Sequence, residues 1–108
     1  MDVRFDEKDG ILVVTPLGAR LDAIEAPDFR AKVGDRAQGR AVLVLDAAPL
    51  AFIDSSGLAA LISVLKRMAP GGALRIAGPA DAVKNLLRIT RLEKIFPSFA
   101  DVHKALAG

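Results

Sequence analysis

The sequence predicts an α/β fold in which an N-terminal β-hairpin precedes alternating β-α units. We expect a mostly parallel sheet of four to five strands with about four helices. Three observations predict this class. Two short strand-like runs open the chain, a continuously apolar run at 41–45 is typical of a strand buried on both faces, and later segments space their apolar residues as helices do. Alternation with short connections implies right-handed crossovers between parallel strands.

The opening hairpin is predicted from two runs of different pattern. Residues 2–6 alternate apolar and polar side chains, as in a half-buried strand, and residues 11–15 form a β-branched apolar run. Gly10 lies between them and favours a turn. We therefore expect the two strands to pair antiparallel.

The first helix is predicted over residues 26–33. Pro27 suits a first-turn position, where its missing N–H costs nothing, and Asp22 or Glu25 is the expected cap. After the buried strand 41–45, residues 49–53 lead into a polar segment and then into a helix over 58–68.

The last third of the chain continues the alternation. Residues 74–77 predict a strand and residues 80–89 a helix with an apolar inner face. A short last strand is expected at 95–96, and Ser98 is the expected cap of a terminal helix at 99–107.

Composition excludes several classes of function. The 108 residues predict one domain spanning 1–108, with no Cys for thiol or zinc-thiolate chemistry and one histidine, His103. There is no Trp or Tyr, the residues that most often stack on single-stranded nucleic acid. The net charge of +2 is the sum of −3 over residues 1–56 and +5 over residues 57–108, which suggests a dipolar surface. We expect no metal, no cofactor and no direct contact with nucleic acid. The opening residues carry no apolar signal core, so we expect a cytoplasmic protein without membrane contact.

The informative segment is Phe52-Ile53-Asp54-Ser55-Ser56-Gly57-Leu58, which joins the end of a predicted strand to the start of a helix. This edge of an α/β sheet is where ligands and partners are usually met. A phosphate on Ser55 would accept the free N–H groups of the first helical turn and be favoured by the helix dipole. The alternative interpretation is ordinary helix capping, in which Ser55 or Ser56 only satisfies backbone donors.

The same segment resembles the signature of STAS domains, and specifically of the small anti-sigma factor antagonists. The segment Gly18-Ala19-Arg20-Leu21-Asp22, the strand at 41–45 and the Gly71-Gly72 turn are also similar to that family. The resemblance covers nearly the whole chain. One departure is that Gly18 to Asp22 has one residue more than the usual pattern, with Ala19-Arg20 in place of a glutamate.

The resemblance implies partner switching. The unphosphorylated protein binds an anti-sigma factor that is also a serine kinase of the histidine-kinase-type ATPase class, phosphorylation at Ser55 releases it, and a serine phosphatase restores binding. Ser56 is the secondary candidate for the phosphate. The partner-binding residues implied are Asp22, Asp54, Ser55, Ser56, Gly57 and Leu58.

Three alternatives are weighed against this hypothesis. Serine hydrolysis needs a positioned base, and Ser55 has no Gly-x-Ser-x-Gly setting while His103 lies in the predicted terminal helix, so we expect no enzyme. A phosphoacceptor-aspartate domain built on Asp46 fails because Gly10 and a second strand follow the acidic pair Asp6-Glu7. A STAS scaffold that binds a partner without phosphorylation, as in transporter, secretion or lipid-transport complexes, remains open.

Overall fold

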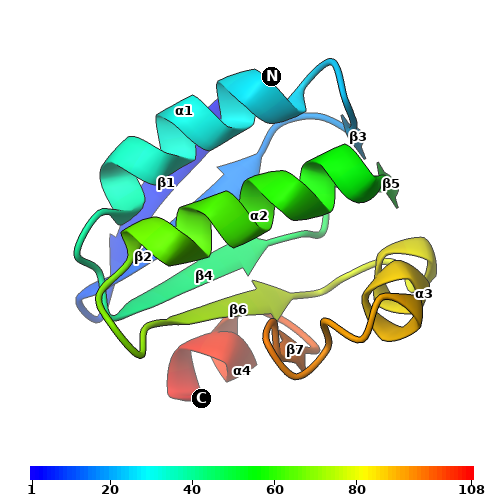
Figure 1. Cartoon of the computed structure of the whole chain (residues 1–108). Coiled ribbons are helices and arrows are strands. Elements are labelled where there is room, and N and C mark those ends of the chain that lie inside the picture. Colours follow the sequence, from blue (N-terminus) through cyan, green and yellow to red (C-terminus); the bar gives the residue numbers. More distant parts are fainter.

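The computed structural model describes all 108 residues, and it confirms the α/β class with four helices around a mixed sheet of five strands (Figure 1). The elements follow one another as β1 (Val3–Lys8), β2 (Ile11–Pro16), β3 (Arg20–Leu21), α1 (Ala26–Ala37), β4 (Val42–Asp46), β5 (Phe52–Ile53), α2 (Ser55–Arg67), β6 (Ala73–Ala77), α3 (Asp81–Ile89), β7 (Ser98–Phe99) and α4 (Val102–Ala107).

The main sheet has the order β1-β2-β4-β6-β7. β1 and β2 form the predicted antiparallel hairpin, with Phe5 opposite Val14. All other pairs are parallel, and Leu43 of β4 lies opposite Leu12 on one side and Leu74 on the other. β4 therefore occupies the centre of the sheet, as its continuous apolar run predicts.

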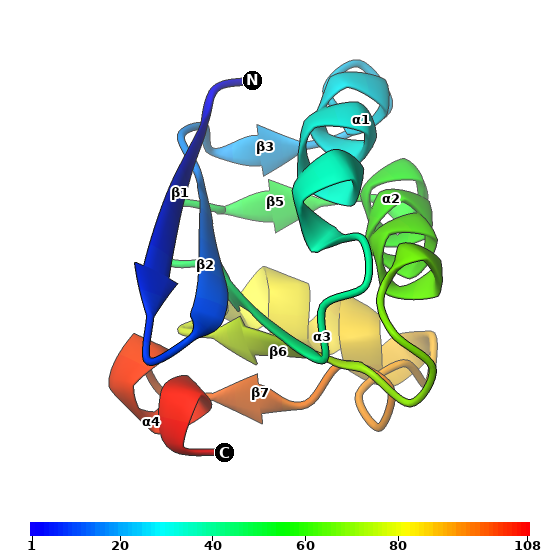
Figure 2. The ribbon, with the colours of Figure 1, turned by 90° about the vertical axis from the view of Figure 1, so that its left-hand side faces the viewer.

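The helices cover the sheet unequally (Figure 2). α1 and α2 pack side by side on one face, and 22 buried residues fill the core between them, α3 and the sheet. Phe29 of α1, Leu61 of α2 and Leu87 of α3 are all fully buried there. On the opposite face α4 alone covers a small cluster around Val13, Val44 and Ala105.

A second, two-stranded sheet was not predicted. β3 pairs parallel with β5, in the register Arg20 to Phe52 and Leu21 to Ile53. Strands of two residues carry no period of alternation, so no pattern in the sequence announces them. This small sheet lies at the end of the molecule where α2 begins (Figure 1).

Two predictions for the segment between α3 and α4 are wrong. Residues 95–96 form no strand, because the N–H groups of Ile95 and Phe96 both donate to the Leu92 carbonyl in a turn. The Phe96 side chain is buried in the core. The last strand instead contains Ser98, so Ser98 is not the cap of the terminal helix. Asp101 has that role, since its Oδ1 accepts a hydrogen bond from the N–H of Lys104 at 2.8 Å.

Three helices differ from their predicted bounds by three residues or more, and one of them is α4, which begins at Val102 rather than at residue 99. α1 continues past residue 33 to Ala37 with Gly34 inside it, and the Arg67 side chain of α2 lies over this glycine where a side chain would stand. Of the two predicted caps, Glu25 stands directly before α1 but its side chain accepts no capping bond. Asp22 caps the turn that leads into α1, since its Oδ1 accepts the N–H groups of Ile24 and Glu25 and its carbonyl accepts that of Ala26. α2 begins three residues earlier than predicted, at Ser55.

α3 ends in an unusual way. The N–H of Leu92 donates to the carbonyl of Leu87 at 2.8 Å and the N–H of Arg91 donates to Arg88 at 3.1 Å, which is the Schellman arrangement. Its central residue, Arg91, has φ of 60°. Glycine usually holds this left-handed position, because a Cβ there costs about 1 kcal/mol.

We expect Arg91→Gly to stabilise the fold by about 0.5 kcal/mol, because the relief of strain exceeds the extra flexibility that glycine gives the unfolded chain. The melting temperature should rise by roughly 2 °C in thermal unfolding followed by circular dichroism. Arg91→Ala is the control, since alanine keeps the Cβ and should give no gain. Equal melting temperatures for the two variants would show that the left-handed backbone of Arg91 does not cost stability.

Candidate functional site

The predicted site residues come together because β3 and β5 are parallel. Leu21 lies beside Ile53, and the Asp54 N–H points to the Leu21 carbonyl at 3.4 Å. Both strands end at the same edge, so the residues that follow them, Asp22 and Asp54, are neighbours although 32 positions separate them. We call Asp22, Asp54, Ser55 and Ser56 the switch edge.

The first turn of α2 is capped by Asp54 rather than by a serine. The Asp54 Oδ1 accepts a hydrogen bond from the N–H of Gly57 at 3.0 Å, so the expectation that Ser55 or Ser56 caps the helix is wrong. Ser55 is exposed and Ser56 is half-buried. The backbone N–H groups of both serines donate to no protein atom, so they stay available to an anion.

Gly57 lets the helix approach β3. A Cβ at this position would overlap the Leu21 backbone carbonyl and would stand 2.6 Å from the Cγ1 of Ile53. The glycine therefore sets how closely α2 and the two-stranded sheet pack, and it fixes the height at which Ser55 stands above the edge.

Asp22 is held as a charged group. Its Oδ1 accepts hydrogen bonds from the N–H groups of Glu25 at 3.2 Å and Ile24 at 3.1 Å, and Arg20 Nε lies 3.4 Å from Oδ2. These contacts, with the Glu25 N–H the largest contributor, keep the pKa of Asp22 below its ordinary value. Asp22 therefore stays ionised at the switch edge, with its charge partly balanced by Arg20.

Arg20, one of the two residues that stand in place of the glutamate expected from the resemblance, has a defined structural role. Its guanidinium lies 4.2 Å from the centre of the Phe52 ring, on the neighbouring strand of the small sheet. The same side chain pairs with Asp22, so one residue joins the acidic edge to β5. Sequence reasoning identified the departure at this position but not the contact with Phe52.

Two shallow hollows flank the switch edge. One, of about 230 Å³, lies between the first turns of α1 and α2 and is lined by Ser56, Arg30, Pro27 and four alanines. The other is lined by Leu17, Arg20, Asp22 and Ile24, and Ile24 is 85% exposed. We call the exposed Ile24 and the small-residue groove beside Ser56 the apolar rim, and the sequence pattern identified neither of them.

The remaining predicted residues lie elsewhere. The Leu58 side chain is buried in the core. His103 lies on α4, which packs on the other face of the sheet from α2. Asp46 binds its own loop, accepting a bond from the Ala48 N–H at 3.2 Å.

No group of three or more His, Cys, Asp or Glu side chains is placed to hold a metal ion. No helix combines the length and the apolar character needed to cross a bilayer.

Comparison with known families gives one match. The model of the STAS domain matches residues 2–105, so the chain belongs to the STAS domain family. A search of curated proteins gave no significant match.

Solved structures share the fold. An anti-sigma factor antagonist from Mycobacterium paratuberculosis superposes with a TM-score of 0.87 at 22% identity, covering 98% of this chain and 91% of that one. An anti-sigma-factor antagonist (STAS) domain protein from Planctomyces limnophilus gives 0.87 at 19% identity, with 97% and 94% covered. The Bacillus cell fate determinant SpoIIAA in its phosphorylated form gives 0.70 at 18% identity, with 98% and 97% covered.

The capping geometry predicts different stabilities for two adjacent variants. Asp54→Ala removes the acceptor for the Gly57 N–H and should cost about 1 kcal/mol of unfolding free energy. Ser55→Ala removes an exposed hydroxyl and should change it by less than about 0.5 kcal/mol. Urea unfolding measures both. A larger loss for Ser55→Ala than for Asp54→Ala would show that the serine, not the aspartate, caps α2.

Gly57→Ala should destabilise the protein by about 2 kcal/mol, because the new methyl group meets the rigid Leu21 carbonyl. Gly34→Ala is the matched control. There the nearest atoms belong to the flexible end of Arg67, so the helix propensity of alanine should make this variant neutral or slightly stabilising. A stabilising Gly57→Ala, measured by urea unfolding, would contradict the close approach of α2 to β3.

Proposed function

We propose that this STAS protein is an anti-sigma factor antagonist that switches partner through phosphorylation of Ser55. In the unphosphorylated form it binds an anti-sigma factor that is also a serine kinase of the histidine-kinase-type ATPase class. Phosphate on Ser55 releases this partner, and a serine phosphatase restores binding. Ser56 is the secondary acceptor. The chain itself acts as a regulatory binding protein and kinase substrate, not as an enzyme.

The observation that carries the proposal is the placing of Ser55. Its side chain is exposed, it begins α2, and its own N–H has no partner in the protein. A kinase can therefore reach the hydroxyl without opening the fold. The name of the Bacillus structure records a phosphorylated form of a protein with this fold, which is consistent with the proposal.

A phosphate on Ser55 would change docking more than it changes stability. Free N–H groups and the dipole of α2 favour the anion by about 1 kcal/mol, which leaves the fold intact. A docked partner, however, must remove water from a group of nearly two negative charges beside Asp22 and Asp54, and that costs several kcal/mol unless the partner supplies cations. The second effect is larger, so phosphorylation releases the partner while α2 stays folded.

The apolar rim fits the unphosphorylated state. Ile24 and the groove lined by Pro27 and Ala59 offer surface that a partner would bury around the serines. Burial at the centre of such an interface is what makes a new charge costly. We therefore propose that Ser55 lies inside the contact area and that Asp22 and Ile24 lie on its border.

The proposal predicts opposite behaviour for two Ser55 variants. Ser55→Ala should bind the kinase with unchanged affinity and take up no phosphate, so ATP should no longer release it. Ser55→Asp should bind roughly tenfold more weakly, because it places one charge where the phosphate places nearly two. Titration calorimetry against a purified kinase of this class measures affinity, and mass spectrometry locates the phosphate.

Ser98→Ala is the control, since Ser98 is exposed but lies on β7. It should accept phosphate at Ser55 as the native chain does. Full phosphate uptake by Ser55→Ala would show that the acceptor is another residue. Binding without phosphorylation of any serine would favour the STAS scaffold instead.

A further inference from the structure

The corner where α3 ends carries exposed cations and exposed apolar side chains together. Ile89 is 74% exposed and Ile95 is 49% exposed, although large apolar residues elsewhere in α3 are buried or half-buried. Each isoleucine directly follows an exposed cation. We define the α3 corner by its exposed members: Lys84, Arg88, Ile89, Arg91, Lys94 and Ile95.

The cations of the α3 corner are unpaired. The protein has seven ion pairs, and every cation in them belongs to residues 1–67. Asp81 and Glu93 lie on the same segment but form no ion pair with Lys84 or Arg88. The corner therefore presents four positive charges to solvent, with only two carboxylates near them in the sequence.

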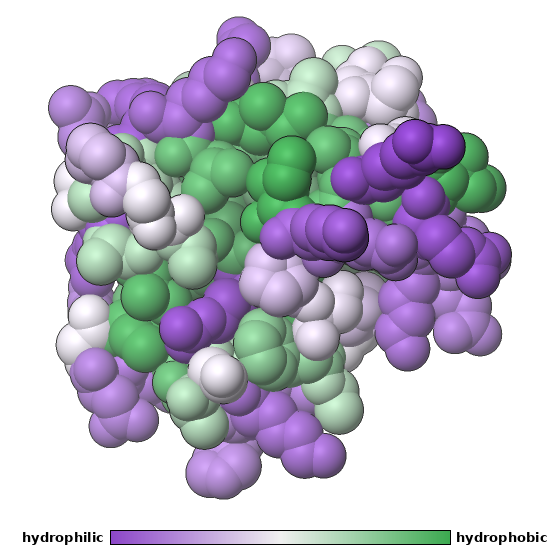
Figure 3. All heavy atoms as spheres, turned by 60° about the horizontal axis from the view of Figure 1, so that its bottom comes forward, coloured by the Kyte–Doolittle hydropathy of each residue, from purple (hydrophilic) through white to green (hydrophobic).

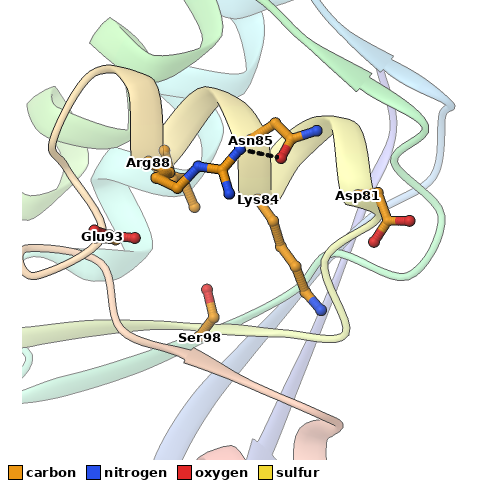
Figure 4. Close-up of a pocket in the computed structure, with 7 residues that line it drawn as sticks. Asp81, Lys84, Asn85, Arg88, Glu93 and Ser98 are labelled. Atoms are coloured by element: carbon orange, nitrogen blue, oxygen red, sulfur yellow. Dashed lines mark hydrogen bonds between the residues drawn. The ribbon is translucent and has the colours of Figure 1, made fainter.

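A hollow of about 510 Å³ adjoins these cations, between α3 and β7. Figure 4 shows Lys84 extending from α3 toward the strand that carries Ser98, while Asn85 accepts a hydrogen bond from Arg88 at 3.0 Å. Asp81 and Glu93 also line this hollow. The lining therefore offers an ammonium, a guanidinium, an amide and a hydroxyl beside two carboxylates, which suits a polar side chain that both donates and accepts hydrogen bonds.

Apolar surface continues from the corner. Leu86, three residues before Ile89 on α3, and Leu92 after the helix are half-buried against the main core. Figure 3 shows an apolar patch on the lower face of the molecule, with long hydrophilic side chains beside it on the side where α3 lies. Charged and apolar contacts are thus offered next to one another.

Arg91 is kept at a strained position that gives its side chain no contact. The residue has φ of 60°, and its guanidinium forms no hydrogen bond or ion pair. Glycine would serve the fold better at this place. The Arg91 side chain, with no partner inside the protein, is therefore free to contact another molecule.

We propose that the α3 corner is a second docking surface, which binds an acidic protein segment that carries apolar side chains. The unpaired cations select acidic groups, the two isoleucines bury apolar ones, and the hollow beside Lys84 receives a polar side chain of the same segment. This surface is separate from the switch edge, and the proposal does not depend on phosphorylation of Ser55.

A protein segment fits the corner better than the other two occupants. An anionic membrane is flat and would leave the polar hollow with Asn85 and Glu93 unfilled. A second copy of the chain would offer its acidic half, but six of the ten carboxylates there already pair with cations of their own. Asp46 and Asp54 accept backbone N–H groups, which leaves Asp2 and Asp9 as the carboxylates with neither kind of contact.

The test uses the full chain and a fluorescent helical peptide of glutamate and leucine with one acidic and one apolar face. Fluorescence anisotropy should show saturable binding. Arg91→Glu combined with Lys94→Glu should weaken it at least about tenfold, and Ile89→Ser combined with Ile95→Ser about fivefold. Circular dichroism verifies that each variant is folded.

The matched control reverses two exposed, unpaired cations elsewhere, Lys8→Glu with Lys66→Glu, and should keep the native affinity. A scrambled peptide of the same composition should bind clearly more weakly. Arg91→Gly should weaken binding about threefold while raising the melting temperature. Ser55→Ala should leave peptide binding unchanged, so this test and the test of the switch edge fail independently.

Three results would overturn the proposal. Equal losses for the corner and control variants would mean that only net charge matters. Corner-dependent binding to phosphatidylcholine–phosphatidylglycerol vesicles, with none to the peptide, would assign the corner to membranes. Corner-dependent self-association in sedimentation velocity would assign it to a second copy.

Discussion

The contact between two very short strands, β3 and β5, is the constraint on which the switch edge depends. Leu21 and Ile53 pair in parallel, and this register makes neighbours of Asp22 and Asp54. Gly57 then packs against the Leu21 carbonyl, which sets the first turn of α2 on the same small sheet. A two-residue strand pair has little stability alone, so the burial of Leu21 and Ile53 in the main core must hold it.

Neighbouring residues of the switch edge have different structural roles. Asp54 satisfies the helix backbone, Gly57 permits close packing, and Ser55 is left without a structural task. Its hydroxyl and N–H are therefore free for chemistry that does not disturb the fold. Arg20 joins the acidic side of the edge to β5 through the Phe52 ring, and so limits how far the charge of Asp22 extends.

The main strands and helices could be predicted from the sequence because their apolar residues follow periodic patterns. The candidate site could be predicted only in part. The apolar run of β4 and the helical spacing in α2 and α3 predict those elements correctly. The pairing of β3 with β5 has no period, and an apolar pair such as Ile95-Phe96 fits a strand as well as a buried turn. The sequence suggested Ser55 as a cap because serine is common there, and only the position of the Asp54 carboxylate decides between them.

At two positions, Gly57 and Arg91, the residue present is not the one that the local backbone favours. They differ in whether a contact inside the protein explains it. Glycine is a poor helix former, and Gly57 is nevertheless found in the first turn of α2 because the Leu21 carbonyl leaves no room for a side chain. Arg91 has a left-handed backbone conformation that glycine adopts more easily, and no contact of its side chain within the protein explains why arginine is found there. The first exception is thus accounted for within the molecule. The second leaves a cation at a strained backbone position in the same corner as two exposed isoleucines, and the proposed acidic partner would supply the contact that the fold does not.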